Sequence, residues 1–403
     1  MKWLMFAWKN VMRNRRRSLT AMLITALGTA AVLASGGFAL YTYESLEEMT
    51  ARDTGHVVVA HARGFEGDED VPLQHGLADA AALAGKFAAL PEVRAVAPRV
   101  QFSGLISNGD KSLVFVGSGV VPEIDFRLRG PQMTFTAGQP PATNAPAPEV
   151  VIGNELAQMM KAKVGSSLTL LATTTEGNLN AVDVVVSGIA SVGVPDIDKR
   201  LVLADLASVQ KLLLSDKVGT LAIYLRETAD TGLVAARVRE MQPGLAVKTW
   251  SDLAVFYTAV RALYNRIFGI LGMIMICIVL FAMSNTLGMA VVERTREIGT
   301  LRAIGTLPSE IVRNFVLEGI VIGGTGATVG MLLAGAATFV LLFAGIEMPP
   351  PPGRSAGYPL CLSFSPLHYA LVTLVVVTLA GCAAWVVSSR AANKPVTEAL
   401  AHV

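Results

Sequence analysis

Four long stretches without a charged residue constrain this chain more than any other feature of its sequence. They are 26, 26, 28 and 35 residues long and cover 18–43, 267–292, 319–346 and 355–389. A helix of about 20 apolar residues crosses a bilayer, and it satisfies its own backbone hydrogen bonds there. We therefore predict an α-helical membrane protein with four transmembrane helices, near 18–42, 267–292, 316–345 and 366–388.

The first stretch has two alternatives, a cleaved signal peptide and a helix buried in a soluble domain. Basic residues up to Arg17 followed by apolar residues with Ala34 and Ala39 suit a signal peptide. The hydrophobic region of such a peptide spans about 7–15 residues, whereas this stretch has 26. Its length favours a transmembrane helix over both alternatives. The net charge of +2 gives no reason to expect nucleic-acid binding.

Lys and Arg near the predicted helices set the expected orientation. Six precede the first helix, four lie between the second and third, a single one lies between the third and fourth, and two follow the fourth. Because basic loops stay in the cytoplasm, we expect cytoplasmic termini, a cytoplasmic loop at 293–312 and an extracytoplasmic insertion at 43–265. Arg261 and Arg266 oppose this rule, and we assign them to a stalk that begins near Asp252.

The segment 1–17 is predicted to be a cytoplasmic helix that lies on the membrane surface. On a helical wheel its basic and apolar side chains separate, with Lys2, Lys9, Arg13 and Arg16 opposite Trp3, Leu4, Ala7, Trp8 and Val11. Such a helix binds the inner leaflet through its apolar face. A plain basic flank of the first transmembrane helix is the alternative.

The insertion 43–265 is expected to fold as a large mixed α/β domain. The three cysteines, Cys277, Cys361 and Cys382, all lie outside it, so a core of its own must hold it together. Alternating and β-branched segments predict strands at 56–60, 93–106, 112–116, 149–152, 167–171, 182–189, 201–203, 221–225 and 245–249. Helices are expected near 75–89, 153–162, 204–214 and 229–241. The Pro-rich segment 137–149 is a predicted exposed loop and a candidate boundary between two subdomains.

Catalytic and nucleotide-binding patterns are absent from the sequence. HExxH, CxxC, GxSxG and the phosphate loop GxxxxGK[ST] do not occur. We interpret His56, His61 and His75 as surface or strand residues, with a metal or catalytic role as the alternative. The glycines of 324–330 resemble a dinucleotide loop, but they lie inside a charge-free stretch without a Lys. No metal or cofactor is therefore expected on this chain.

Gly319, Gly323, Gly326 and Gly330 form a stripe of small residues on the third transmembrane helix, with spacings of 4, 3 and 4. Small residues allow membrane helices to approach closely. The stripe therefore predicts helix–helix packing, against the second helix, the fourth helix or a second copy. Two polar residues also lie in the predicted spans: we expect Glu318 to pair with Arg313 or Arg302, and Asn285 to hydrogen-bond across helices.

The strongest local signal is the segment Glu293–Gly305, which reads ERTREIGTLRAIG. It predicts a short charged helix that ends near Gly305, and Pro308 suits the first turn of the next helix. Ile298, Leu301 and Ile304 form a small apolar patch among charged residues. Such a helix can dock into a groove of a cytoplasmic partner, with charges steering and apolar residues anchoring it. A solvated connector is the alternative.

This segment resembles the hallmark of FtsX-like and MacB-like ABC transporter permeases, the type VII family. Other parts of the chain resemble the family in the same order, namely residues 8–20, Gly55–Val59, Val150–Ala157 with Lys163–Gly165, and Lys394–Leu400. The resemblance therefore extends over nearly the whole chain. It implies a periplasmic MacB-like domain with stalk at 43–265 and an FtsX-like permease domain at 266–403.

The resemblance also implies partners and a mechanism. Such permeases are non-catalytic inner-membrane subunits that work as dimers, here with a second copy or a homologue, together with a cytoplasmic ABC ATPase dimer that binds ATP and Mg. Movement of the ATPase is relayed to the periplasmic domain, which is called mechanotransmission. The implied coupling residues are Glu293, Arg294, Arg296, Glu297, Ile298, Leu301, Arg302, Ile304 and Gly305.

Gly55–Val59, Lys248–Leu253 and the outer loop Pro349–Gly353 are most similar to lipoprotein-releasing (Lol-type) permeases. This similarity implies extraction or export of a lipoprotein or another amphiphilic envelope substrate, with or without a periplasmic adaptor. The alternatives are an FtsX-like signalling or scaffold protein that activates a periplasmic partner, and a MacB-like efflux permease. A membrane-anchored enzyme is disfavoured because catalytic patterns are absent.

Overall fold

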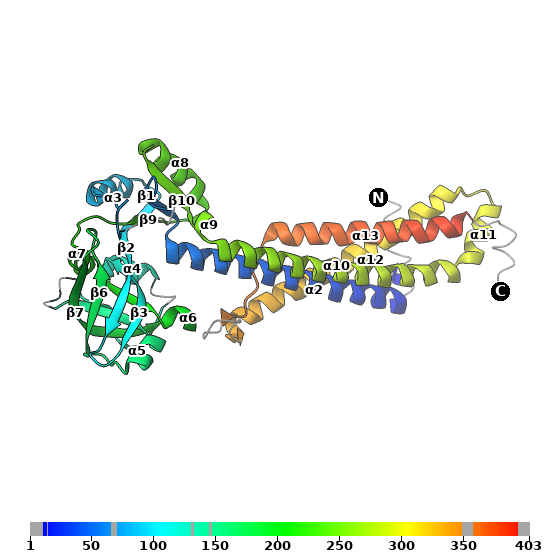
Figure 1. The fold of residues 1–403 in the computed structure, drawn as a ribbon. Helices are drawn as coiled ribbons and strands as arrows, with labels where there is room; N and C mark the ends of the chain where they lie inside the picture. The colour runs from blue at the N-terminus through cyan, green and yellow to red at the C-terminus, as the bar shows by residue number, and fades with distance from the viewer. Residues whose placement is uncertain are drawn as a thin grey trace. The chain divides into compact units, whose positions relative to one another are not determined.

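The computed structural model describes residues 11–13, 15–65, 71–129, 133–143, 145, 147–348 and 358–393 (Figure 1). The chain divides into two compact units. The first comprises Met1–Glu44, Val260–Glu347 and Pro359–Val403, and the second comprises Ser45–Ala259 and Met348–Tyr358. The predicted surface helix at 1–17 lies mostly outside the described residues, and the segments Pro349–Gly353 and Lys394–Leu400 lie entirely outside them.

The described residues contain four helices that are long and apolar enough to cross a membrane. They are α2 (Arg15–Thr54), α10 (Val255–Glu293), α12 (Pro308–Ala344) and α13 (Pro366–Ala392). The predicted fold class is confirmed: four such helices, with a mixed α/β domain between the first two. Local sequence explains where α12 begins and ends, because Pro308 is in its first turn and Gly345 follows it in the left-handed conformation (φ +58).

Two of these helices extend beyond the predicted membrane spans. The helix α10 begins at Val255, close to the predicted start of the stalk near Asp252, whereas the continuation of α2 to Thr54, beyond residue 42, was not predicted. The extra turns carry charged residues such as Glu48, Arg52 and Arg261, which do not belong in lipid. Hydropathy marks the part of a helix that fits the bilayer, so it could not mark the polar extension of α2.

The glycine stripe of α12 contacts two different helices. A Cβ added to Gly319 or Gly323 would lie 2.6 Å and 2.5 Å from the Cβ atoms of Ala384 and Ala380 on α13. The other two glycines face α2, where an added Cβ would lie 2.7 Å from the Thr25 Cβ at Gly326 and 2.5 Å from the Ala26 carbonyl oxygen at Gly330. The fourth transmembrane helix was among the predicted neighbours, whereas the first was not considered.

The second unit is built on one extended sheet. Its strands are β1 (Val57–His61), β2 (Val93–Ser107), β3 (Ser112–Val120), β4 (Thr134–Gly138), β5 (Glu149–Gly153), β6 (Ser167–Thr173), β7 (Leu179–Ser191), β8 (Leu201–Asp205), β9 (Thr220–Leu225) and β10 (Leu245–Thr249). Its helices are α3 (Ala80–Ala88), α4 (Pro122–Arg129), α5 (Asn154–Met160), α6 (Pro195–Asp198), α7 (Leu206–Leu213), α8 (Thr231–Met241) and α9 (Trp250–Leu253). The sequence missed β4, α4, α6 and α9. Two further short strands, β11 (Glu347–Met348) and β12 (Tyr358–Pro359), pair with each other.

The strand β2 belongs to both halves of this unit. Its first part, Val93–Arg99, pairs with β9, which continues the sheet to β1 and β10. Its second part, Val100–Ser107, pairs with β3, and Gly104–Ser107 also pairs with β6. The pairings β2–β3–β8–β5–β7–β6–β2 close a ring, which we call the barrel.

The Pro-rich segment 137–149 does not separate the two halves. It lies between β4 and β5, and both of these strands pair with β7 of the barrel. The prediction of a subdomain boundary there is therefore wrong, because the change from one half to the other occurs within β2. One continuous apolar core, which includes Val57, Phe87, Phe115 and Ile152, extends through both halves. This core explains how the domain folds without a disulfide bond.

The contact between α12 and α13 yields a testable prediction. We expect Gly323→Ala to lower the midpoint of thermal unfolding in detergent, because the new methyl group must displace Ala380, and overpacking costs about 1–3 kcal/mol. Gly335→Ala on the same helix is the matched control, since an added Cβ there meets no atom within 4 Å. The double variant Gly323→Ala/Ala380→Gly should recover most of the loss. Equal stability of the Gly323 and Gly335 variants would contradict the packing described here.

Candidate coupling site

The predicted coupling segment forms a short helix between two long ones. The helix α10 ends at Glu293, α11 (Thr295–Ala303) follows, and α12 begins at Pro308. Gly305 has a φ of +103, a conformation that glycine adopts without strain. Its amide donates to the Arg302 carbonyl at 3.1 Å, and the Thr306 amide donates to the Leu301 carbonyl at 3.0 Å. These bonds satisfy carbonyls at the end of α11.

One face of α11 packs against the membrane helices of its own chain. Thr295, Ile298 and Gly299 are buried. Ile298 is 3% exposed and belongs to an apolar cluster with Val291, Ile311, Phe315 and Ala392. The sequence had grouped Ile298 with Leu301 and Ile304 as one patch. The structure separates them, because Ile298 anchors α11 to α12 and α13.

Three large apolar side chains are exposed at the end of α11 and in the turn that follows it. Leu301, Ile304 and Leu307 are 47%, 78% and 60% exposed. The sequence analysis did not include Leu307 among the docking residues, although its position directly before Pro308, where the next helix begins, pointed to an exposed turn. Arg296 and Glu297 are exposed as well, whereas Arg302 is half-buried. We call Leu301, Ile304 and Leu307 the exposed triad.

A buried ion pair fixes the junction between α10 and α11. Arg294 lies between the two helices, and its Nη1 donates to Glu318 Oε2 on α12 at 3.3 Å. The Arg294 residue is 9% exposed and Glu318 is 3% exposed. Glu318 was predicted to pair with Arg313 or Arg302, but the ion pair in the structure is with Arg294. Because a buried charge without its partner is costly, this pair holds the start of α11 against α12.

The remaining candidate residues lie elsewhere. Asn285 is exposed on α10, so it does not pack between the helices of its own chain. The rings of His61 and His75 stack with centroids 5.4 Å apart, and His56 is buried. Within the described ranges, no group of three or more His, Cys, Asp or Glu residues could hold a metal ion.

Comparison with known families decides the class of protein. A family described as the MacB-like periplasmic core domain matches residues 18–241, which is more than half of the chain. A second family, the FtsX-like permease C-terminal domain, matches residues 269–396 and therefore includes α11. The chain belongs to the FtsX/MacB-like type VII ABC transporter permeases. It is thus a multi-pass bacterial inner-membrane permease with a periplasmic domain, as its relation to Lol-type permeases predicted.

Individual relatives are distant. The lipoprotein-releasing system transmembrane protein LolC of Xylella fastidiosa (strain Temecula1) is 24% identical over 249 residues, which cover 60% of each chain. The ABC transporter permease YtrF of Bacillus subtilis is 37% identical over 113 residues, 28% of this chain and 26% of YtrF. The periplasmic region of MacB from Actinobacillus actinomycetemcomitans is similar in structure with a TM-score of 0.36 and 12% identity, over 50% of this chain and 93% of that one. The chain thus spans about 60% of the length of the LolC protein it matches.

The Arg294–Glu318 pair leads to a prediction about this permease. We expect Glu318→Gln to destabilise the chain by about 3–5 kcal/mol, because it leaves Arg294 buried and unpaired. The charge swap Arg294→Glu/Glu318→Arg should recover part of that loss. Thermal unfolding in detergent measures both, and hydrogen exchange of the α11 amides should rise in Glu318→Gln. Glu297→Gln is the control, since Glu297 is exposed on the same helix; if both single variants were equally stable, the pair would have no anchoring role.

Proposed function

We propose that this permease is the membrane subunit of an ABC transporter that a separate cytoplasmic ATPase dimer drives. The observation that carries the proposal is the exposed triad, which begins on α11 and continues into the turn before α12, in a segment that Ile298 and Arg294 anchor to the helices of the same chain. Three large apolar side chains that face water form a natural anchor for a partner groove. Arg296 and Glu297 flank the triad with charges that steer the encounter. ATP and Mg bind to the partner, because this chain has no phosphate loop.

The packing of the bundle supports a mechanical role for α11. Ile298 and Arg294 attach it to α12, and the glycine stripe attaches α12 to both α13 and α2. Close contacts between small residues leave little free volume, so a displacement of one helix is passed to its neighbours. In this proposal the termini and α11 are cytoplasmic, and nucleotide-driven movement of the ATPase reaches the periplasmic domain through α2 and α10.

A second permease subunit, either a copy or a homologue, completes the transporter in this proposal. The helix α10 exposes a broad apolar face that includes Met273, Ile278, Phe281 and Met289. Ser284, Asn285 and Gly288 line a shallow groove of the same helix. Polar side chains within a membrane span usually face protein and not lipid. The exposed Asn285 therefore supports a protein neighbour on this face.

The proposed substrate is a lipoprotein or another amphiphilic molecule of the envelope. Its support is the similarity to proteins named as transmembrane components of a lipoprotein-releasing system. A lipid-anchored substrate suits a permease whose ATP-driven movement acts on a periplasmic domain. A periplasmic adaptor or acceptor would then receive the extracted substrate.

Docking of the ATPase is tested by making the exposed triad polar. Leu301→Asp/Ile304→Asp should abolish co-purification of the ATPase subunit, because charged carboxylates do not enter an apolar groove. Leu233→Asp is a matched control: Leu233 lies on α8 of the periplasmic domain and is 50% exposed, against 47% for Leu301. Unchanged ATPase binding by the Leu301/Ile304 variant would refute the docking surface.

The substrate class is tested by what the assembled complex retains. We expect mass spectrometry to detect an acylated protein bound to the nucleotide-free complex, and trapping with ATP and vanadate should release it. The Leu301→Asp/Ile304→Asp variant should retain the acylated protein in both conditions, because the ATPase no longer binds and cannot move the permease. Recovery of a peptidoglycan hydrolase instead of an acylated protein would contradict transport and favour the signalling alternative.

A further inference from the structure

The helix α2 ends inside the periplasmic domain, where side chains of two strands bind its last carbonyl groups. The final carbonyl groups of a helix have no amide donors within it. Gly55 stops α2 with a φ of +96, and its amide donates to the Ala51 carbonyl at 2.9 Å. The carbonyls of Arg52, Asp53 and Thr54 remain to be satisfied.

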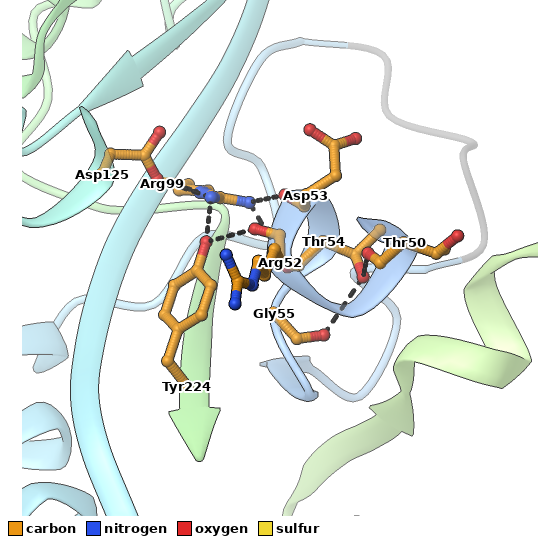
Figure 2. A network of polar contacts seen from close by, with 8 residues as sticks. All are labelled: Thr50, Arg52, Asp53, Thr54, Gly55, Arg99, Asp125 and Tyr224. Carbon is orange, nitrogen blue, oxygen red and sulfur yellow. Dashed lines mark hydrogen bonds and ion pairs between the residues drawn. The ribbon is translucent and has the colours of Figure 1, made fainter. Parts of the chain in front are cut away.

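Side chains from two strands supply those donors (Figure 2). Arg99 Nη1, from β2, donates to the Asp53 carbonyl at 2.7 Å and to the Thr54 carbonyl at 3.3 Å. The Tyr224 hydroxyl, from β9, donates to the Arg52 carbonyl at 3.2 Å. These donors bind groups that point along the helix axis, so they resist pulling and pushing along α2. The positive charge of Arg99 also complements the negative end of the helix dipole.

The guanidinium of Arg99 is held from its other side as well. Its Nε and Nη2 donate to Asp125 Oδ1 of α4 at 3.0 Å and 2.5 Å. Nη2 also donates to the Tyr224 hydroxyl. The side chains of Arg99 and Asp125 are 12% and 3% exposed. All three guanidinium nitrogens are therefore engaged in a largely buried network, which we call the α2 joint.

Arg99 occupies the residue at which β2 passes from one half of the domain to the other. Arg99 is the last residue of β2 that pairs with β9, opposite Thr220, and Val100 is the first that pairs with β3, opposite Gly119. A force applied to the end of α2 thus reaches the sheet where the barrel begins. Asp125 connects the same point to α4.

The start of α10 lies close to the end of α2. The Trp250 amide donates to the His56 carbonyl at 3.0 Å, and Trp250 packs with Ala51 of α2 and Tyr257 of α10. His56 accepts a hydrogen bond from the Leu225 amide at 3.3 Å. Burial, together with the nearby positive charge of Arg52, lowers the pKa of His56 to about 4. His56 is therefore neutral at neutral pH and adds no positive charge beside the joint.

We propose that Arg99 is a positioning residue that transmits displacement of α2 to the barrel, an inference that rests on the proposed ATP-driven relay. One planar guanidinium joins the α2 terminus, β9 and α4 at fixed angles. A lysine keeps the charge beside Asp125, but it is a point charge that cannot span these partners in the same geometry. Arg99→Lys should therefore leave the domain folded while it loosens the connection between α2 and the barrel.

The test is hydrogen exchange of the full-length permease assembled with its ATPase, with and without trapping by ATP and vanadate. In the wild type we expect trapping to change exchange both in α11 and in barrel strands. In Arg99→Lys the change in α11 should persist, and the change in the barrel should be lost. Tyr224→Phe, which removes the donor to the Arg52 carbonyl, should reduce the barrel change.

Arg237→Lys is the matched control, because Arg237 pairs with Glu92 at 2.7 Å in the same domain but outside the α2 joint. It should keep the wild-type response in both regions. A barrel response in Arg99→Lys equal to that of the wild type would overturn the inference. So would uniformly faster exchange with an unchanged nucleotide-dependent difference, which indicates a purely stabilising role. Absence of any barrel response in the wild type would refute the relay itself.

Discussion

Close contact between small residues is the interaction on which the membrane unit depends. Lipid tails are as apolar as leucine, so burying apolar surface between membrane helices gains little, and van der Waals packing must hold them together. Gly319 and Gly323 bring the α12 backbone against Ala384 and Ala380, and Gly326 and Gly330 bring it against α2. The helix α12 thereby becomes the common neighbour of α2 and α13, and α11 acquires a fixed support.

The sequence predicted the features that single residues or short patterns determine. Charge-free length located four membrane spans, and the Gly305–Pro308 spacing located the break between α11 and α12. Periodicity could not show which face of α11 is buried, because Ile298 and Leu301 are equally apolar and only tertiary contacts separate them. The partner of Glu318 was missed for the same reason, since several arginines of one loop were possible partners.

The two halves of the periplasmic domain meet within one uninterrupted strand, β2, so the sequence did not show where one half ends. Proline-rich segments usually mark boundaries, yet 137–149 joins two strands that pair with the same neighbour. The real transition lies inside β2, where Arg99 and Val100 have different partner strands. A change of pairing partner leaves no local signature in composition, because each strand requires the same alternation of buried and exposed residues.

Arg99 and Arg294 solve a similar physical problem in the two units. Each lies where a long helix ends, and each pairs with a carboxylate that is 3% exposed, on Asp125 and Glu318 respectively. Removing water makes such pairs sensitive to geometry, because desolvation is offset only when the partners meet at close range. A buried arginine at such a position therefore tolerates little displacement of the helix end relative to the carboxylate. In the proposed ATP-driven relay, that intolerance is useful, since motion at one end of a helix is passed on and not absorbed where the helix ends.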